Sequence, residues 1–150
     1  MTEEVALIVG GGPGISASCA RLFASEGMKV AVAARNIDKE VLKSLAKDHG
    51  ITLIACDASD PESVAALYDT VIDLLGAPTL VVHNIDGRLK DVFRKSITDV
   101  EPGPFLDTLK NSTYSAFLVG QRAAREMLAQ DGRDDHKGTI LFTNASAAMK

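Results

Sequence analysis

The apolar residues of this chain fall into two alternating patterns, short continuous runs and longer stretches with helical spacing. A continuous apolar run is typical of a strand whose two faces are both covered, as in a parallel sheet. Such runs predict five strands, at residues 5–9, 28–34, 51–55, 79–84 and 139–144. The first run, VALIV, is expected at the centre of the sheet.

Helical spacing of apolar positions predicts a helix in each interval between these strands. The helices are expected at residues 14–27, 38–49, 60–75 and 104–130. Asp38 and Asp60 are expected to cap the second and third helices, and Pro61 suits a first turn. The residues expected in phase on the last helix are Leu106, Leu109, Phe117, Gly120, Ala124 and Met127. Residues 87–103 are polar and predict irregular structure.

Strands that alternate with helices indicate parallel crossover units, which place helices on both faces of a sheet. The expected fold class is therefore α/β, a doubly wound and mostly parallel sheet of the Rossmann-like kind, with residues 1–150 forming a single domain. A sheet of this kind normally continues past its fifth strand, because otherwise an edge is left where the sixth would pair. The domain is thus expected to be truncated after the fifth strand.

The composition mainly bears on which classes of partner, such as nucleic acids and membranes, are excluded. The 150 residues are 46% apolar with a net charge of −4, so they can bury a core but offer no basic surface for nucleic acid. No apolar run approaches the roughly 18 residues of a membrane span, and the opening MTEEV does not resemble a signal peptide. A cytoplasmic protein without nucleic-acid or membrane partners is expected. Cys19 and Cys56 are expected as two free buried thiols.

A glycine-rich turn, GGGPG, joins the first strand to the first helix. Gly10, Gly12 and Gly14 let backbone N–H groups and the positive end of the helix dipole face a pyrophosphate. Pro13 has no N–H to offer and stiffens the turn instead. The alternative is that these glycines serve only a tight connection.

Arg35 lies at the end of the second strand, 21 residues after Gly14. Dinucleotide-binding folds place the group that contacts the adenosine ribose about 20 residues beyond the glycines. Ala33 and Ala34 occupy the place where a carboxylate would bind the 2′-hydroxyl of NAD, whereas an arginine pairs with the 2′-phosphate of NADP. NADP (NADPH) is therefore expected in preference to NAD, the alternative being a surface arginine.

These motifs resemble those of the short-chain dehydrogenase/reductase family, whose glycine pattern is T-G-x-x-x-G-[hydrophobic]-G. The stretch VGGGPGIS matches that pattern at Gly10, Gly14 and Ile15, while Val9 and Ser16 depart from it. The resemblance implies that the turn, including Ile15, holds the cofactor pyrophosphate. A serine in the last position is small enough to keep helix and strand close.

By the same resemblance, Asp57 would accept a hydrogen bond from the adenine amino group, and Ala58 would contact the adenine ring through its backbone. Asn84 would line the cofactor ribose and brace the strands, although its neighbours depart from the family's N-N-A-G motif. An ordinary strand-ending asparagine is the alternative.

Members of that family transfer hydride between a nicotinamide and a carbonyl or alcohol, with a Tyr-x-x-x-Lys pair beyond the fifth strand. The lysine is required because a tyrosine, with a pKa of about 10, serves at neutral pH only when a cation stabilises its phenolate. Neither Tyr68 nor Tyr114 has a lysine four residues on, and both are expected to pack in or on helices.

Two further catalytic candidates follow from the resemblance. Ser146 is the candidate that holds the substrate oxygen, although counting along the strand favours Ala145 for that position. Asn111 is the candidate for the family's proton-relay asparagine, and the neighbouring Ser112 competes for the same position.

The histidines have structural explanations. His49 suits the negative end of a helix dipole, and His83 is expected to be hydrogen-bonded at a strand end. His136 lies beside Asp134 and Asp135 in a solvated turn, for which a metal site is the less favoured alternative.

Two functions are consistent with the sequence. The first is an NADP-dependent oxidoreductase of the short-chain type acting on a small carbonyl or alcohol, of which these residues are the cofactor-binding part. The alternative is a non-catalytic nucleotide-binding sensor or scaffold subunit, which the missing Tyr-x-x-x-Lys pair would suit. The resemblance also implies a homodimer or homotetramer.

Overall fold

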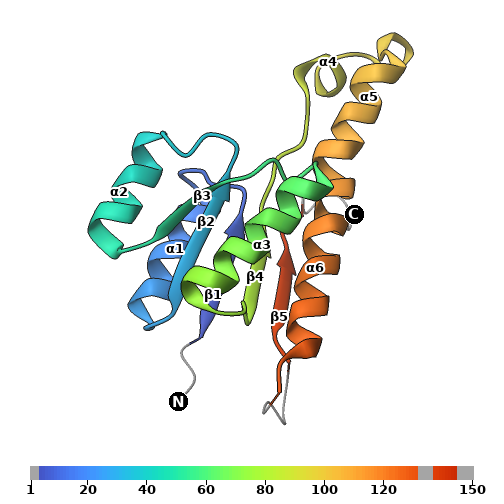
Figure 1. The fold of residues 1–150 in the computed structure, drawn as a ribbon. Coiled ribbons are helices and arrows are strands. Elements are labelled where there is room, and N and C mark those ends of the chain that lie inside the picture. Colours follow the sequence, from blue (N-terminus) through green and yellow to red (C-terminus); the bar gives the residue numbers. More distant parts are fainter. Residues whose placement is uncertain (1–3, 132–136, 145–150) are drawn as a thin grey trace.

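The computed structural model describes residues 4–131 and 137–144. At its centre lies a parallel sheet with the strand order β3-β2-β1-β4-β5 (Figure 1). The strands are β1 (Val5–Val9), β2 (Lys29–Ala34), β3 (Thr52–Ala55), β4 (Leu80–His83) and β5 (Thr139–Phe142). All five expected strands are confirmed, with bounds that differ from those predicted by at most two residues.

Helices cover both faces of the sheet, which confirms the doubly wound fold class (Figure 1). One face carries α1 (Ile15–Ser25) and α2 (Glu40–His49), and the other carries α3 (Pro61–Leu75) and α6 (Ser115–Ala129). This arrangement leaves the ends of the strands free to form a site.

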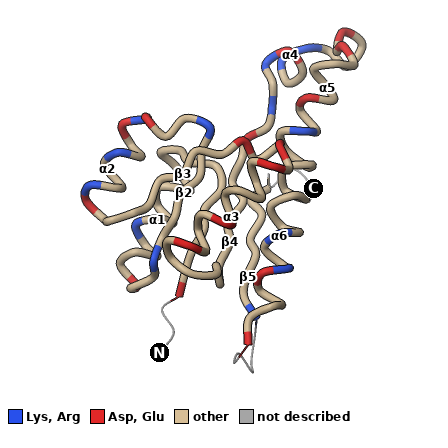
Figure 2. The backbone as a smooth tube through the Cα atoms, viewed as in Figure 1, with Lys and Arg blue, Asp and Glu red and all other residues tan. Residues whose placement is uncertain are grey.

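Strand β1 shows why its apolar run is continuous. Ala6 and Ile8 belong to the core under α1 and α2, while Val5, Leu7 and Val9 belong to the core under α3 and α6. Successive side chains of a strand point to opposite faces, so a strand covered twice needs apolar residues at every position. All five side chains are at most 2% exposed, and β1 carries no Lys, Arg, Asp or Glu (Figure 2).

The helix expected at residues 104–130 is longer and divided. It begins as α5 (Pro102–Leu109), passes through a π-helical turn, η2 (Lys110–Tyr114), and continues as α6. The preceding region contains a short helix, α4 (Lys90–Phe93), and a 3₁₀ turn, η1 (Ile97–Asp99), where irregular structure was predicted. Figure 1 shows α4 and the start of α5 projecting beyond the end of the sheet.

The predicted apolar face of the long helix is confirmed at Met127 but wrong at Leu106, Leu109 and Phe117. A π-helical turn inserts one extra residue, which rotates every later side chain by about 100° around the axis. Phe117 is therefore 55% exposed, and Leu106 is 62% exposed because α5 extends past the sheet. The residues that α6 buries are Ser115, Val119, Ala123 and Met127.

Of the two predicted helix caps, one is confirmed and one is wrong. Asp60 caps α3, its Oδ2 accepting a hydrogen bond from the N–H of Ser63 at 2.8 Å. Asp38 does not cap α2, which has Lys39 at its N-cap and begins at Glu40. The N–H of Asp38 instead donates to Asn36 Oδ1 at 2.8 Å, so a side-chain turn replaces the expected first residues of the helix.

Cys19 and Cys56 are both free, but only Cys56 is buried. Cys19 lies at the edge of the face that α1 turns to the sheet and is partly exposed, so the expectation of a buried thiol is wrong there. In the part of the chain that the structure describes, no helix is long and apolar enough to cross a membrane. Asp134, Asp135 and His136 lie outside the described residues.

Candidate functional site

A cavity of about 870 Å³ opens at the carboxyl ends of the central strands. Strand order reverses between β1 and β4, and such reversal points are where open α/β sheets bind ligands. The predicted cofactor residues that line the cavity are Gly10, Gly12, Gly14, Ile15, Arg35, Asp57, Ala58 and Asn84. Pro13, the remaining one, is exposed in the same turn.

The glycine turn depends on Gly10 for its shape. Gly10 has a φ of +109°, and a Cβ placed there would lie 2.0 Å from the carbonyl oxygen of Asn84. By contrast, a Cβ at Gly12 or Gly14 would meet nothing within 4 Å. Gly10 is therefore needed for the fold of the turn, and Gly12 and Gly14 leave the turn open to a close ligand.

Some backbone N–H groups of the glycine turn are used in hydrogen bonds within the protein, and others are left for a ligand in the cavity. The N–H groups of Gly10 and Gly11 both donate to the carbonyl of Ala33, at 2.9 and 3.1 Å. Pro13 has no N–H and the N–H of Ser18 donates to the carbonyl of Gly14 at 3.1 Å, whereas among the described residues no hydrogen bond uses the N–H groups of Gly12 and Gly14, which remain for an anion. Gly14, the N-cap residue of α1, offers no side chain to satisfy that helix end.

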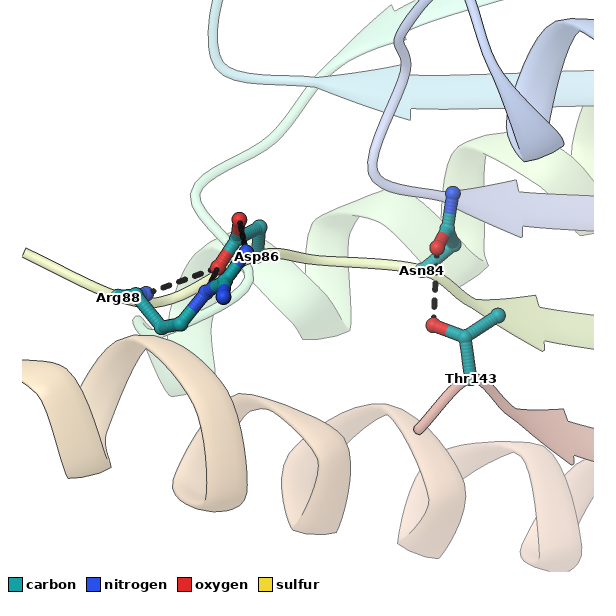
Figure 3. Close-up of polar contacts among 4 residues, drawn as sticks. All are labelled: Asn84, Asp86, Arg88 and Thr143. Carbon is teal, nitrogen blue, oxygen red and sulfur yellow. Dashed lines mark hydrogen bonds and ion pairs between the residues drawn. The ribbon is translucent and has the colours of Figure 1, made fainter. Parts of the chain in front are cut away.

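Ser16 and Asn84 tie the turn to the neighbouring strands. Ser16 Oγ donates to the carbonyl of Gly10 and accepts from Asn84 Nδ2 at 2.7 Å. On its other side, Asn84 Oδ1 accepts from Thr143 Oγ1 at 2.8 Å (Figure 3). Asn84 thus links Ser16 on α1 to Thr143, the residue directly after β5.

Two cations stand at the end of β2. Arg35 lines the cavity with an exposed side chain, and Lys39 Nζ donates to the carbonyl of Gly11 at 3.0 Å. Sequence reasoning missed Lys39. Its position four residues after Arg35, at the start of α2, is the signal that could have identified it.

Asp57 lines the same cavity and is held as a carboxylate. Its Oδ1 accepts from the hydroxyl of Ser59 at 2.7 Å and from the N–H of Ser59 at 3.0 Å. These bonds, followed by the charges of Arg35 and Lys110, hold the pKa of Asp57 below its usual range. A carboxylate kept ionised in this way can accept a hydrogen bond from an amino group.

The segment after β4 forms the far wall of the cavity. Asp86 and Arg88 line it and form a bidentate ion pair, in which Arg88 Nε and Nη2 each donate to Asp86 at 2.7 Å (Figure 3). Arg88 also lies over the ring of Phe93, with its guanidinium carbon 4.6 Å from the ring centroid. Sequence reasoning did not identify this pair.

The π-helical turn brings Asn111 to the cavity. Asn111 lines it, whereas Ser112 Oγ donates back to the carbonyl of Thr108 at 2.6 Å. Gly87 packs closely on this turn, since a Cβ there would lie 2.6 Å from Ser112 N. The structure therefore favours Asn111 over Ser112 for a role at the cavity.

His83 ends β4 as a buried, hydrogen-bonded residue, as predicted. Its Nε2 lies 2.9 Å from Ser115 Oγ, which is also 2.7 Å from the carbonyl of Asn111. Burial lowers the pKa of His83, against a weaker opposing effect of its own backbone. His49 ends α2 and is followed by Gly50 in the left-handed conformation, as its helix-terminal prediction requires.

Acidification is expected to destabilise the fold through His83. Below the ordinary histidine pKa of about 6.5 the unfolded chain takes up a proton that folded His83, with its lowered pKa, does not. The free energy of unfolding therefore falls as the pH is lowered through this window, by at most about 1.4 kcal/mol per pH unit from this residue. Urea unfolding at about pH 7.5 and about pH 5.5 measures the effect.

The matched variants for that measurement are His83→Asn and His49→Asn, because His49 is exposed. The pH dependence should become shallower in His83→Asn than in His49→Asn. An undiminished pH dependence in His83→Asn would show that His83 does not carry it.

The tyrosines take the packing roles that were expected. Tyr68 is fully buried and donates from its hydroxyl to the carbonyl of Val119 at 2.8 Å, and burial raises its pKa. Tyr114 is 41% exposed and stacks on Phe117. Among the described residues, the cavity lining includes no tyrosine. Ser146 and its competitor Ala145 lie outside the described residues.

Known proteins share both the sequence and the architecture. A family model described as enoyl-(acyl carrier protein) reductase matches residues 10–150. The chain is 30% identical over 151 residues to short chain aldehyde dehydrogenase 1 of Euphorbia lathyris, covering 97% of this chain and 49% of that protein. The chain thus spans about half the length of the curated relatives it matches.

Solved structures share the architecture of this chain. A short-chain type dehydrogenase/reductase from Mycobacterium marinum superposes with a TM-score of 0.80 at 26% identity, covering 98% of this chain and 57% of that chain. An actinorhodin polyketide ketoreductase solved with NADPH gives a TM-score of 0.81 at 23% identity, covering 99% and 55% of the two chains. At 23% identity, the similarity to the ketoreductase shows a shared fold and no more.

Proposed function

Because the chain belongs to the short-chain dehydrogenase/reductase family, an oxidoreductase family, we propose that its cavity holds NADPH. The enzyme as a whole would transfer hydride between the nicotinamide and a carbonyl or alcohol substrate. The observation that carries this proposal is that the glycine turn, Arg35 and Asp57 line one cavity at the carboxyl ends of the strands.

The residues present fit a dinucleotide. The open side of Gly12 and Gly14 gives room for a pyrophosphate against backbone amides and the start of α1. Arg35 and Lys39 supply two positive charges for a 2′-phosphate, and the nearby carboxylate of Asp57 is already hydrogen-bonded to Ser59.

The remaining assignments in this site follow the family resemblance. Asp57 would accept from the adenine amino group, with Ala58 against the ring, and Asn84 would line the ribose on the nicotinamide side. Asn111 would hold the water of a proton relay, since it reaches the cavity wall beside the segment after β4. Ser146 would hold the substrate oxygen. When bound, the nicotinamide supplies or accepts the hydride.

NADPH is expected to bind this chain at least about tenfold more tightly than NADH, because charge-assisted bonds to the 2′-phosphate contribute roughly 1.5–3 kcal/mol. Calorimetric titration with each nucleotide measures the difference, and titration with 2′,5′-ADP and 5′-AMP isolates the adenosine half. Equal affinities would contradict the NADP preference. Absence of binding by all four nucleotides would contradict the cofactor site itself.

A nucleotide-binding subunit without chemistry is the second candidate, because residues 1–150 contain no Tyr-x-x-x-Lys pair. Such a subunit would bind NADPH in the same cavity. The two candidates separate when the longest natural form of the protein is supplied with NADPH and a panel of small carbonyl compounds. Consumption of NADPH favours the oxidoreductase.

We also propose a homodimer or homotetramer that uses the α5 surface. Phe105, Leu106 and Leu109 on this helix are 46%, 62% and 41% exposed. Exposed apolar side chains gathered on one element are typical of a surface that another chain covers.

A further inference from the structure

Ser16 occupies an unusual place for a helical serine. It is the second residue of α1 and only 1% exposed. A helical serine commonly donates to a carbonyl one turn earlier in its own helix. Ser16 Oγ instead donates to the carbonyl of Gly10, six residues back and inside the glycine turn. The hydroxyl therefore acts on the turn rather than on the helix.

The same hydroxyl is one link in a directed chain of hydrogen bonds. Thr143 Oγ1 donates to Asn84 Oδ1 at 2.8 Å, Asn84 Nδ2 donates to Ser16 Oγ at 2.7 Å, and Ser16 then donates to Gly10. The Thr143 hydroxyl also lies 3.3 Å from the carbonyl of His83, but its shorter contact is the one to Asn84. With Oδ1 accepting from Thr143 and Nδ2 donating to Ser16, both ends of the Asn84 amide have partners. Figure 3 shows the Thr143 end of this chain, where Asn84, directly after β4, meets Thr143, directly after β5.

The backbone reinforces this connection. The N–H of Asn84 donates to the carbonyl of Val9 at 2.8 Å, directly before the turn. Gly10 approaches the Asn84 carbonyl so closely that a Cβ would lie 2.0 Å from its oxygen. The turn therefore packs against the end of β4, and Ser16 on α1 hydrogen-bonds the carbonyl of Gly10 within the turn.

We propose that Ser16 is a positioning residue for the cofactor turn, which sets the amides of Gly12 and Gly14 by holding the Gly10 carbonyl. Through Asn84 it couples this turn to Thr143 at the end of β5. The glycine expected at this position from the family pattern has no hydroxyl, so the coupling is a property of this chain. The inference rests on the proposed binding of NADPH in the cavity.

Ser16→Ala removes the hydroxyl with little change in volume and keeps a good helix former. NADPH affinity should fall about fivefold to tenfold, as expected for the loss of neutral hydrogen bonds that orient backbone donors. Ser18→Ala is the matched control, because Ser18 is exposed on the same helix. It should leave the affinity unchanged. NADPH affinity of Ser16→Ala equal to that of the unaltered chain would overturn the inference.

Thr143→Val tests the coupling from the far end without altering the turn. Thr143 is exposed, and valine keeps its shape while removing the donor to Asn84. NADPH affinity should fall about twofold to threefold, and the double variant with Ser16→Ala should lose less than the product of the single losses. Strictly multiplicative losses would overturn the coupling.

A readout without ligand separates this inference from the proposed function. In ¹H–¹⁵N spectra of the free protein, Ser16→Ala should shift the side-chain amide signals of Asn84 and the backbone amides of Gly12 and Gly14, whereas Ser18→Ala should not. Unmoved Gly12 and Gly14 signals would overturn the positioning role. If these signals move but the unaltered chain binds no NADPH, only the proposed function fails.

Discussion

Gly10→Ala is expected to lower the free energy of unfolding by about 3 kcal/mol or more. Two costs add at this position. The backbone has a φ of +109°, which disfavours every residue with a side chain, and the new Cβ would lie 2.0 Å from the Asn84 carbonyl oxygen. That oxygen belongs to backbone at the end of β4, so it cannot move aside as a flexible side chain could. Urea unfolding followed by circular dichroism measures the loss.

Gly12→Ala is the matched control for this experiment. Gly12 lies in the same turn, but a Cβ there would meet nothing within 4 Å. Its free energy of unfolding should stay within about 1 kcal/mol of the unaltered value, while NADPH binding weakens because the methyl group occupies the open side of the turn. Equal stability of the two variants would contradict the close approach of the turn to β4.

Arg35→Ala is expected to weaken NADPH binding by about tenfold to a hundredfold and to leave NADH binding nearly unchanged. The guanidinium lines the cavity at the end of β2, where a 2′-phosphate would accept paired hydrogen bonds from it. NADH has no such phosphate and so loses no bond. Calorimetric titration of the variant with both nucleotides gives the two affinities.

The control for the charge change is Arg21→Ala. Arg21 is exposed on α1, and its removal alters the net charge by the same amount. It should leave both affinities unchanged. If Arg35→Ala weakened NADPH and NADH equally, Arg35 would be supporting the shape of the cavity rather than contacting the phosphate.

The strands and their positions were predictable from local pattern. VALIV and the other apolar runs are continuous because helices cover both faces of the sheet. A strand covered on both faces needs an apolar residue at each position, and this pattern can be recognised in the sequence. The cap at Asp60 was predictable for a similar reason, since the bond from Ser63 spans only three residues.

The apolar face of the long helix was not predictable in this way. Periodicity assumes an uninterrupted helix, and the π-helical turn at Lys110–Tyr114 shifts the later residues by one position. Of the two competing candidates Asn111 and Ser112, it is Asn111 that lines the cavity. Asp38 does not cap α2 because its N–H donates to the side chain of Asn36, which forms a turn in place of the first helical residues.

Local pattern in this chain determines which segments become strands and helices, and it places the glycine turn and Arg35 at strand ends. The contacts that join those ends depend on the tertiary structure. Asn84 is 68 residues from Ser16 and 59 residues from Thr143, and these groups can meet only after β4 pairs with β1 and β5. The VGGGPGIS stretch thus predicts a phosphate turn, whereas the packing of three strand ends decides how that turn is held.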